Sequence, residues 1–477
     1  MLTALALTCL SLGAGAPPLA ATGRDNVLVV VLDDVGADAV SCYPGAAADA
    51  RTPNLDRLAA RGIRFDRVWS NPACSPTRAT IMTGRYGFRT GVGSVKSLEI
   101  AGLRPEEVSL AESVRAEAPE VRTAFIGKWH LGPTEAQGPV PQGFEVFRGT
   151  SGNLRARGRA RAYFEYDERQ GREVTTTLRA RYATSAVVDD ALETIRGFGA
   201  DPWVLIASFH AAHTPLHVPP EGLHRGGLSG PDEAPPRALF IAMVDALDHE
   251  VGRLVEGLPE DVRGRTHVIV VSDNGGASLT QAPGHPGRKG KGSLFEDGIR
   301  VPMIVAGPAV RGAPRASDAL VNTTDLFATV HELLGARPHP RAEDSSSFAD
   351  VLRGETDGVR RWCLAERFQE PPEDGRYLPV DRYTVTDGRF KRTVDVLGGT
   401  ERLYDLAADP LERTDLLRAD ELPEDASRAN AALSRVIEEE LRRTEVKARR
   451  RRAAAPEPEE VEGAGPAGGD QERSAPR

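Results

Sequence analysis

Short apolar runs alternate with amphipathic segments along most of the chain. Residues 26–32 (NVLVVVL) are continuously apolar and rich in β-branched side chains, which is typical of a strand buried on both faces. Similar runs predict further strands at 121–126, 203–209, 267–272 and 302–306. Helices are predicted at 52–62, with Thr52 as N-cap and Pro53 as first residue, and at 237–257, where apolar residues recur every three or four positions. The alternation predicts an α/β fold with a large, mostly parallel sheet flanked by helices.

The pattern changes after about residue 355. Alternating segments within 383–406 predict a small antiparallel sheet, with turns at Asp387-Gly388 and Gly398-Gly399. A polar-faced helix is predicted at 427–444, and the Arg-rich, then Glu-, Pro- and Gly-rich end predicts a disordered tail. We therefore divide the chain into a leader at 1–21, a main domain at 24–355, a C-terminal α+β subdomain at 356–445 and a tail at 446–477.

The leader consists of small apolar residues followed by an Ala-rich segment that resembles a signal-peptide cleavage site. This composition predicts a secretory signal peptide, and hence a secreted or periplasmic protein, with a disordered apolar leader as the alternative. Its prolines and short length argue against a membrane span. The formal net charge of −9, with acidic and basic residues interspersed, argues against nucleic acid as the main partner.

The chain has four cysteines. If Cys9 is removed with the signal peptide, Cys42, Cys74 and Cys363 remain, and an odd set leaves at least one unpaired thiol. Cys74 is the natural candidate. Cys42 and Cys363 can pair only if the fold brings them together.

Cys74 lies in the segment 71–78 (NPACSPTR). Pro76 suits the first turn of a helix because that turn needs no N–H from it, and the sequence continues as a helix to Met82. Cys74 would then lie at the helix N-terminus, where an anion is favoured and a thiol is reactive or chemically altered. The alternative is a small buried cysteine beside a salt-bridging arginine, Arg78.

Polar residues follow four predicted strands, and the carboxyl ends of parallel strands meet at one edge of a sheet. Asp33, Asp34, Asp273 and Asn274 offer hard oxygen ligands, which suit Ca²⁺ or Mg²⁺ better than zinc, although such residues also cap helices and form turns. A second group supplies charge and proton transfer for a bound oxyanion: Arg78, Lys128, His130, His213 and Lys291. The other histidines singled out, His210, His217, His224 and His285, have no comparable setting.

The segment Cys74-Ser75-Pro76-Thr77-Arg78, followed by Thr83-Gly84-Arg85, resembles the signature of the type I, formylglycine-dependent sulfatases of the alkaline phosphatase superfamily. Further matching segments are 32–36 (LDDVG), 127–132 (GKWHLG), 213–216 (HTPL), 272–276 (SDNGG), 298–302 (GIRVP), 403–406 (LYDL) and 409–412 (DPLE). The resemblance runs from about residue 25 to 420 in the family's order. One departure is Asp297, where the family usually has a glycine.

The resemblance implies an alkaline-phosphatase-like fold, one Ca²⁺ (with Mg²⁺ as the alternative) and a formylglycine (3-oxoalanine) made from Cys74 by a formylglycine-generating enzyme. By position it implies that Asp33, Asp34, Asp273, Asn274 and the modified Cys74 bind the metal. It further implies that Arg78 and His130 hold the hydrated aldehyde. Lys128, Lys291 and His213 would bind the sulfate, and His213 or Lys291 would protonate the leaving alcohol.

The implied activity is that of an arylsulfatase-type sulfuric ester hydrolase acting on aryl sulfates or sulfated carbohydrates. One hydroxyl of the aldehyde hydrate attacks sulfur, and the second allows sulfate to be released. Two alternatives remain: a phosphonate monoester or phosphate diester hydrolase, and a non-catalytic sulfated-glycan binding protein in which Cys74 is never converted. The arginines at 155, 157, 159 and 161 either attract an anionic polysaccharide or form a solvated loop.

Overall fold

The fold is built around one large sheet. The computed structural model describes residues 23–95, 102–132, 134–154, 162–171, 177–228, 234–282, 289–368 and 381–454. The predicted signal peptide and His285 lie outside these residues, as do the arginines at 155–161. Among the described residues, no helix is both long enough and apolar enough to cross a membrane.

The strands outside the C-terminal part are β1 (Asn26–Leu32), β2 (Ile63–Phe65), β3 (Val68–Trp69), β4 (Arg122–Lys128), β5 (Val146–Thr150), β6 (Glu165–Gln170), β7 (Thr177–Ala180), β8 (Trp203–Ser208), β9 (Thr266–Ser272), β10 (Met303–Ala306), β11 (Arg315–Ser317) and β12 (Val321–Asn322). Ten of them form one sheet in the order β11-β2-β10-β9-β1-β8-β4-β5-β6-β7, and β3 pairs with β12 separately. Neighbours from β9 to β5 are parallel, whereas β10 runs antiparallel to β9. β9, β1, β8 and β4 therefore end at the same edge, and β10 starts there.

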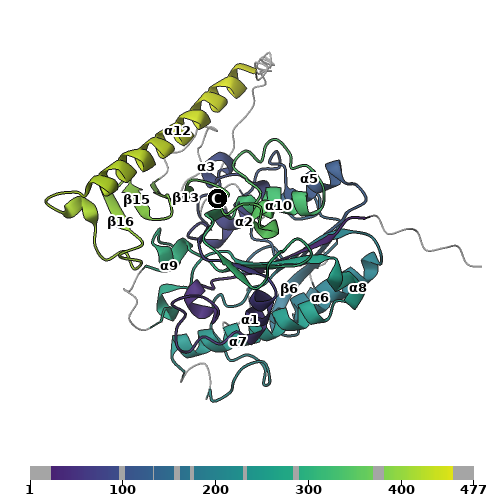
Figure 1. Cartoon of the computed structure of the whole chain (residues 1–477). Coiled ribbons are helices and arrows are strands. Elements are labelled where there is room, and N and C mark those ends of the chain that lie inside the picture. Colours follow the sequence, from purple (N-terminus) through teal and green to yellow (C-terminus); the bar gives the residue numbers. More distant parts are fainter. Residues whose placement is uncertain are drawn as a thin grey trace, which may run out of the picture.

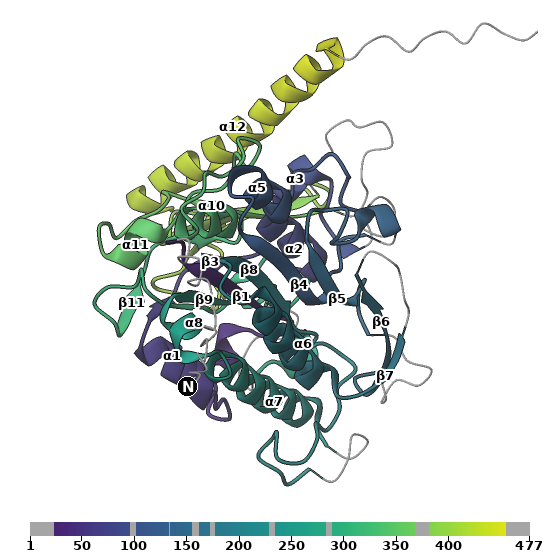
Figure 2. The same cartoon turned by 90° about the vertical axis from the view of Figure 1, so that its right-hand side faces the viewer.

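The α-helices before the C-terminal part are α1 (Pro53–Ala60), α2 (Cys74–Thr83), α3 (Gly87–Thr90), α5 (Leu110–Glu117), α6 (Ala183–Phe198), α7 (Pro236–Glu256), α8 (Glu260–Gly264), α9 (Glu296–Ile299), α10 (Asp325–Leu333) and α11 (Ala349–Arg353). Short 3₁₀ turns are η1 (Ala37–Ala39), η2 (Glu135–Gln137), η4 (Ser278–Thr280) and η5 (Leu416–Arg418). α1, α6 and α7 cover one face of the sheet, and α2, α5 and α10 cover the other (Figures 1 and 2).

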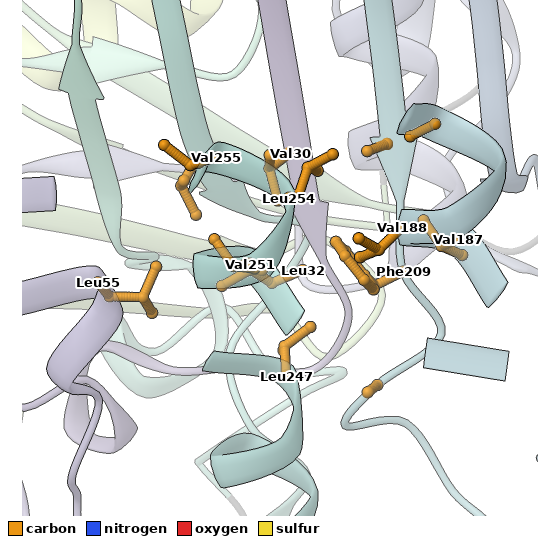
Figure 3. Close-up of a cluster of buried hydrophobic side chains, with 14 of the residues drawn as sticks. Val30, Leu32, Leu55, Val187, Val188, Phe209, Leu247, Val251, Leu254 and Val255 are labelled. Carbon is orange, nitrogen blue, oxygen red and sulfur yellow. The ribbon is translucent and has the colours of Figure 1, made fainter. Parts of the chain in front are cut away.

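The continuous apolar run of β1 is explained by burial on both faces. Val27, Val29 and Val31 belong to the core beneath α2 and α10, while the alternate residues belong to the core beneath α6 and α7. Figure 3 shows the second core, where Val30 and Leu32 meet side chains of the helices that cover this face. A side chain buried in this way contributes about 1.5–3 kcal/mol, so the two cores hold the strand ends rigidly.

The predicted α/β fold is confirmed, and each predicted strand has a counterpart in β1, β4, β8, β9 or β10. The predicted helices correspond to α1 and α7. Thr52 precedes α1, but its side chain makes no cap. The carboxylate of Asp248 in α7 accepts hydrogen bonds from the backbone N–H groups of Asn54 and Leu55 instead. A distant residue therefore caps the helix, which local sequence does not indicate.

The C-terminal part contains a second, antiparallel sheet. Its strands β13 (Cys363–Arg367), β14 (Arg382–Thr386), β15 (Phe390–Asp395) and β16 (Thr400–Asp405) follow one another in space, and the last three match the predicted hairpins. Helix α12 (Glu424–Ala454) packs on one face of this sheet and extends beyond it (Figure 1).

Helix α12 is longer than predicted. It includes residues 446–454, and with them the arginine run 449–452, which we expected in a disordered tail. The physical reason is that arginine is a good helix former. Residues 455–477 lie outside the described part of the chain.

The three cysteines within the described residues, Cys42, Cys74 and Cys363, are free. Cys363 is fully buried in the second sheet, whereas Cys42 packs at the edge of the core beneath α1 and α7. The fold therefore does not pair Cys42 with Cys363.

A buried ion cluster joins the second sheet to the main domain. Lys391 of β15 is fully buried, and its ammonium lies 3.0 Å from Glu296 and 2.9 Å from Glu412. It also lies 5.0 Å from the ring centroid of Trp69. Because Glu296 follows closely after Lys291, the cluster fixes the second sheet against the loop that carries that lysine.

We expect Lys391→Met to lower the free energy of unfolding by about 3–5 kcal/mol, because two buried glutamates would lose their common cation. Urea denaturation followed by circular dichroism measures this change.

The matched control is Arg389→Met in the turn before β15. Arg389 is half exposed and pairs with Asp405 and Asp425 at the surface, where ion pairs add little. Its unfolding curve should coincide with that of the wild type. Equal losses in both variants would contradict a special role for the buried cluster.

Candidate active site

Cys74 is the first residue of α2, as the sequence predicts. Every residue of α2 is buried, and Pro76 occupies the first turn without an N–H to satisfy. Ala73 at the N-cap provides no side-chain cap, so the positive end of the helix points to Cys74. Gly84 ends the helix in the left-handed conformation, with φ of 64°.

The predicted metal ligands come together at the edge where β1 and β9 end. Asp33, Asp34 and Asp273 are buried and place carboxylate oxygens within 4.8 Å of one another. The Nδ2 of Asn274 donates to Oδ1 of Asp34 at 2.7 Å. Asp34 has a positive φ of 63°, a rare conformation for a residue other than glycine that is often found at functional sites.

Two buried oxygens of this group lack hydrogen-bond partners: Oδ1 of Asp33 and Oδ1 of Asn274. Buried acceptors are normally satisfied, and a cation would satisfy both. Carboxylate and amide oxygens are the ligands that Ca²⁺ and Mg²⁺ prefer. The residues present therefore fit a hard divalent cation.

Arg78 ties four neighbouring strand ends together. Its guanidinium donates to Oδ2 of Asp273 at 2.8 Å and to Oδ2 of Asp33 at 3.2 Å, just beyond β9 and β1. It also donates to the carbonyl of Lys128, at the end of β4, at 2.8 Å and to Oγ of Ser208, at the end of β8, at 2.5 Å. The resemblance implies that Arg78 holds the nucleophile; in the structure its donors order two of the predicted metal ligands and the backbone of Lys128.

Two lysines complete the charge balance of the site. Lys128 is fully buried and pairs with Asp33, and Lys291 pairs with Asp34 at 2.7 Å. The loop of Lys291 is held on both sides. The backbone N–H of Lys291 donates to the carbonyl of Gly276, and the N–H of Gly292 donates to the carbonyl of Pro72. This loop is therefore hydrogen-bonded to the segments that carry Asn274 and Cys74.

His213 lies beside Cys74 and Asp33, with possible ligand atoms within 4.8 Å of one another. Its Nδ1 lies 2.7 Å from the carbonyl of Thr214, which assigns the proton to that nitrogen in the neutral ring. The hydroxyl of Tyr163 lies 2.5 Å from the carbonyl of His210 and 2.7 Å from that of His213. Tyr163 therefore fixes the turn that presents His213.

His130 follows β4 and is buried, with a φ of 58° and no partner at Nδ1. A Cβ at Gly152 would lie 3.2 Å from its ring. Burial, and then the nearby charge of Lys128, hold the pKa of His130 well below its ordinary value. His130 is therefore a neutral ring beside the two cations Lys128 and Arg78.

Burial and nearby charges also shift the pKa values of the other ionisable groups in the site. Burial alone would raise the pKa of Asp33, but Lys128 and the other cations hold it below its ordinary value. Burial and then the charge of Asp33 raise the pKa of Asp273 to about 6, and burial raises the pKa of the Cys74 thiol. Three carboxylates thus face three cations, so a bound divalent cation would make the site positive and suited to an anion.

The structure brings all the predicted site residues together: Asp33, Asp34, Cys74, Arg78, Lys128, His130, His213, Asp273, Asn274 and Lys291. Sequence reasoning missed Ser208 and Tyr163. Ser208 had a usable signal, because it is a polar residue one position before the end of the strand predicted at 203–209. Tyr163 had none, since it is far from its partners in sequence and lies in no recognisable motif.

The remaining predicted histidines within the described residues have structural roles. Nε2 of His210 lies 2.8 Å from Oγ1 of Thr150 and burial lowers the pKa of His210 to about 3. The ring of His217 packs 4.2 Å from that of Tyr163, and Nδ1 of His224 accepts from the N–H of Gly226.

Asp297, where the resemblance expects glycine, causes no distortion. It lies within the helical turn α9, and its Oδ2 accepts a hydrogen bond from Gln281 at 3.3 Å. The neighbouring Gly298 is the position that needs glycine, because a Cβ there would lie 2.3 Å from the carbonyl oxygen of Ser293.

Comparison with known proteins gives consistent matches. The family model described as Sulfatase matches residues 25–336. N-acetylgalactosamine-6-sulfatase of Canis lupus familiaris is 31% identical over 379 residues, covering 73% of this chain and 69% of that protein. Across the dog, pig and human enzymes of this name, the chain spans 64–69% of the relative's length.

Arylsulfatase A of Homo sapiens is 27% identical over 475 residues, covering 86% of each chain. The crystal structure of Ps i-CgsB matches with a TM-score of 0.72 at 23% identity, covering 87% of this chain and 92% of that one. The two chains share a fold.

We expect a hard divalent cation to stabilise the protein, because the cation would bind the carboxylates that the folded state brings together and would not bind the unfolded chain. At a free Ca²⁺ concentration 100 times its dissociation constant, the stabilisation should be about 2.7 kcal/mol relative to chelated protein. Thermal unfolding with chelator, Ca²⁺, Mg²⁺ or Zn²⁺ measures it, and Zn²⁺ should have the smallest effect.

Asp34→Asn should remove most of this stabilisation. Asp38→Asn is the control, because Asp38 lies four residues further on and pairs with Arg237 at 3.2 Å. If the unfolding temperature of the wild type did not change when Ca²⁺ or Mg²⁺ was added, the unpaired oxygens of Asp33 and Asn274 would not bind a cation.

Proposed function

The chain belongs to the sulfatase family, and we propose that residue 74, oxidised from cysteine to formylglycine, is the nucleophile of its sulfate ester hydrolysis. The observation that carries this proposal is the position of Cys74 at the start of α2, beside Asp33 and His213. Formylglycine and a divalent metal are general to the family. The relatives named above support an aryl sulfate or a sulfated carbohydrate as the substrate.

The proposed metal is Ca²⁺, with Mg²⁺ as the alternative. Asp33, Asp34, Asp273, Asn274 and the modified residue 74 would hold it, and the two orphaned oxygens support this assignment. When bound, the cation supplies positive charge that lowers the pKa of a coordinated hydroxyl.

Formylglycine supplies, as its hydrate, two hydroxyls on one carbon, one to displace the alcohol from sulfur and one to release sulfate. A serine would have only the first. The neutral ring of His130 is the proposed acceptor for a hydroxyl proton, because its Nδ1 has no other partner.

The sulfate oxygens would contact Lys128 and Lys291, whose ammonium groups pair with Asp33 and Asp34. Burial opposes the charge of Lys291, but Asp34 raises the pKa of Lys291 above its ordinary value. Lys291 therefore stays protonated, and it is better suited to stabilise the negative charge of the sulfate than to donate a proton. His213 is the proposed donor to the leaving alcohol in its imidazolium form, with the second proton on Nε2, because the Nδ1 proton is used on the Thr214 carbonyl. Tyr163 holds the His213 turn in place.

Maturation would need a formylglycine-generating enzyme acting on Cys74, Pro76 and Arg78. In the folded protein Cys74 is 1% exposed and Arg78 is 4% exposed. An enzyme cannot reach a fully buried helix, so we propose that oxidation precedes folding. The proposed secretion through a signal peptide at 1–21 rests on the sequence alone.

The matured protein should hydrolyse an aryl sulfate with a much larger kcat/KM than the matching aryl phosphonate. In the same preparation, the peptide containing residue 74 should be about 18 Da lighter than its cysteine form, the difference between an aldehyde and a thiol. Parallel initial-rate assays and peptide mass mapping provide both measurements.

The control is Cys74→Ser, which should release at most one equivalent of alcohol because it lacks the second hydroxyl. A strong preference for the phosphonate would favour the phosphonate monoester hydrolase. Active enzyme with an unmodified thiol would exclude the formylglycine mechanism.

Tyr163→Phe should lower kcat for an aryl sulfate by about tenfold, because losing one buried hydrogen bond costs about 0.5–1.5 kcal/mol and frees the His213 turn. The rate loss should be largest with poor leaving groups, which depend most on proton donation. A series of aryl sulfates with different leaving-group pKa values measures this dependence.

Tyr182→Phe is the matched control. Its hydroxyl lies 3.2 Å from Nε2 of His217, in the same aromatic cluster but away from the His213 carbonyl. It should keep the wild-type dependence on the leaving group. The same steeper dependence in both variants would assign the effect to general loosening of the cluster.

A further inference from the structure

A cavity lies beside the active site, between the Lys291 loop and the second sheet. Its volume is about 560 Å³, within the range of small-ligand sites. The residues that matter here are Lys291, Arg367, Arg382, Asp395, Arg402 and Tyr404, which all line it. We refer to it as the arginine cavity. Lys291 links it to the active site, because the ammonium of the same residue pairs with Asp34.

Strand register explains why the arginines converge. Arg367 lies opposite Arg382 in the neighbouring strand, and Arg382 lies opposite Asp395. Arg402 lies opposite Thr393, two residues before Asp395, so it shares their face of the sheet. The other face packs against α12. One face of a small sheet thus presents three guanidinium groups to the Lys291 loop.

The charges in the arginine cavity are not balanced. Arg382 pairs with Asp395 at 2.8 Å, but Arg367 donates to the carbonyl of Gly292, and Arg402 hydrogen-bonds to the side chain of Tyr404. Within the described part of the chain, no carboxylate forms an ion pair with Arg367 or Arg402. Burial, and then the charge of Arg382, lower the pKa of Arg367, and the charge of Asp381 only partly offsets them.

Lys391 provides an internal comparison, because it lies on the same face of the same sheet. Its charge is matched by two buried glutamates. Among the described residues, the fold thus pairs the buried Lys391 with two carboxylates, whereas Arg367 and Arg402 form no ion pair with a carboxylate. An excess of cations in a concave site favours an anionic ligand.

We propose that the arginine cavity binds a second anionic group of the substrate, a sulfate or a carboxylate on the sugar next to the one that carries the scissile sulfate. The inference rests on the proposed function, because it takes Lys291 as a contact of the scissile sulfate. Guanidinium groups match both anions, since their planar donors can bind two oxygens at once. The substrate class is then a polyanionic oligosaccharide.

The test uses the matured full-length enzyme and disaccharides with one scissile sulfate. The neighbouring sugar carries a second sulfate, a uronic acid carboxylate or no charge. The wild type should show a kcat/KM about tenfold or more higher for at least one anionic neighbour than for the neutral one, expressed mainly in KM, because hydrogen bonds to charged groups are strong. The preferred anion identifies the ligand.

Arg402→Gln should reduce this ratio about tenfold, and Arg402→Lys should retain part of it because the charge remains. The ratio does not depend on the fraction of folded or matured enzyme, since both substrates meet the same preparation. Arg389→Gln, an exposed arginine near the same sheet but outside the cavity, should keep the wild-type ratio.

An unchanged ratio in Arg402→Gln, or no preference in the wild type, would overturn the assignment of the cavity. These results differ from failure of the proposed function, in which the wild type would hydrolyse neither the aryl sulfate nor any of the disaccharides.

Discussion

The hydrogen bonds of one guanidinium group hold the active site together. Arg78 reaches the ends of four adjacent parallel strands, β9, β1, β8 and β4, and meets a carboxylate, a hydroxyl or a carbonyl at each. A buried arginine is costly unless all its donors are used, and a buried carboxylate is costly without a cation. Each group therefore needs the others in place. The helix that supplies Arg78 also supplies Cys74, so the proposed nucleophile and the proposed metal ligands are positioned by the same helix.

The second sheet extends this arrangement outward. It is attached through the buried lysine and two glutamates, and these contacts fix the loop that brings Lys291 to the carboxylates. β10 runs antiparallel to its neighbours, and for this reason the chain enters the sheet at the edge where the other strands leave it. A loop before β10 can thus complete a site made by loops after β1, β4 and β9.

Much of this could be predicted from sequence, because the decisive signals are local. A continuous apolar run ending in Asp33 and Asp34 predicts both a buried strand and the place where its polar residues gather. The spacing of Cys74 and Pro76 predicts the helix start. What could not be predicted depends on long-range contacts: the capping of α1 by Asp248, the contacts of Tyr163 and the convergence of the arginines across β13, β14 and β16. Register in a small sheet is set by pairing that no single segment reveals, and β13 itself was missed. The contacts of Arg78 belong to the same class, since its partners lie on four separate strands.

The distance along the chain between Arg78 and Asp273 has a consequence for synthesis. The two residues are 195 positions apart, and β1 pairs with β9 only after both have been made. At about 5–20 residues per second, roughly 10–40 s pass between the emergence of Cys74 and that of its last carboxylate neighbour. During that interval α2 lacks the partner that most fully neutralises its arginine. The order of segments in the chain therefore sets a minimum time before Arg78 can form its ion pair with Asp273, and that time depends on the rate of translation.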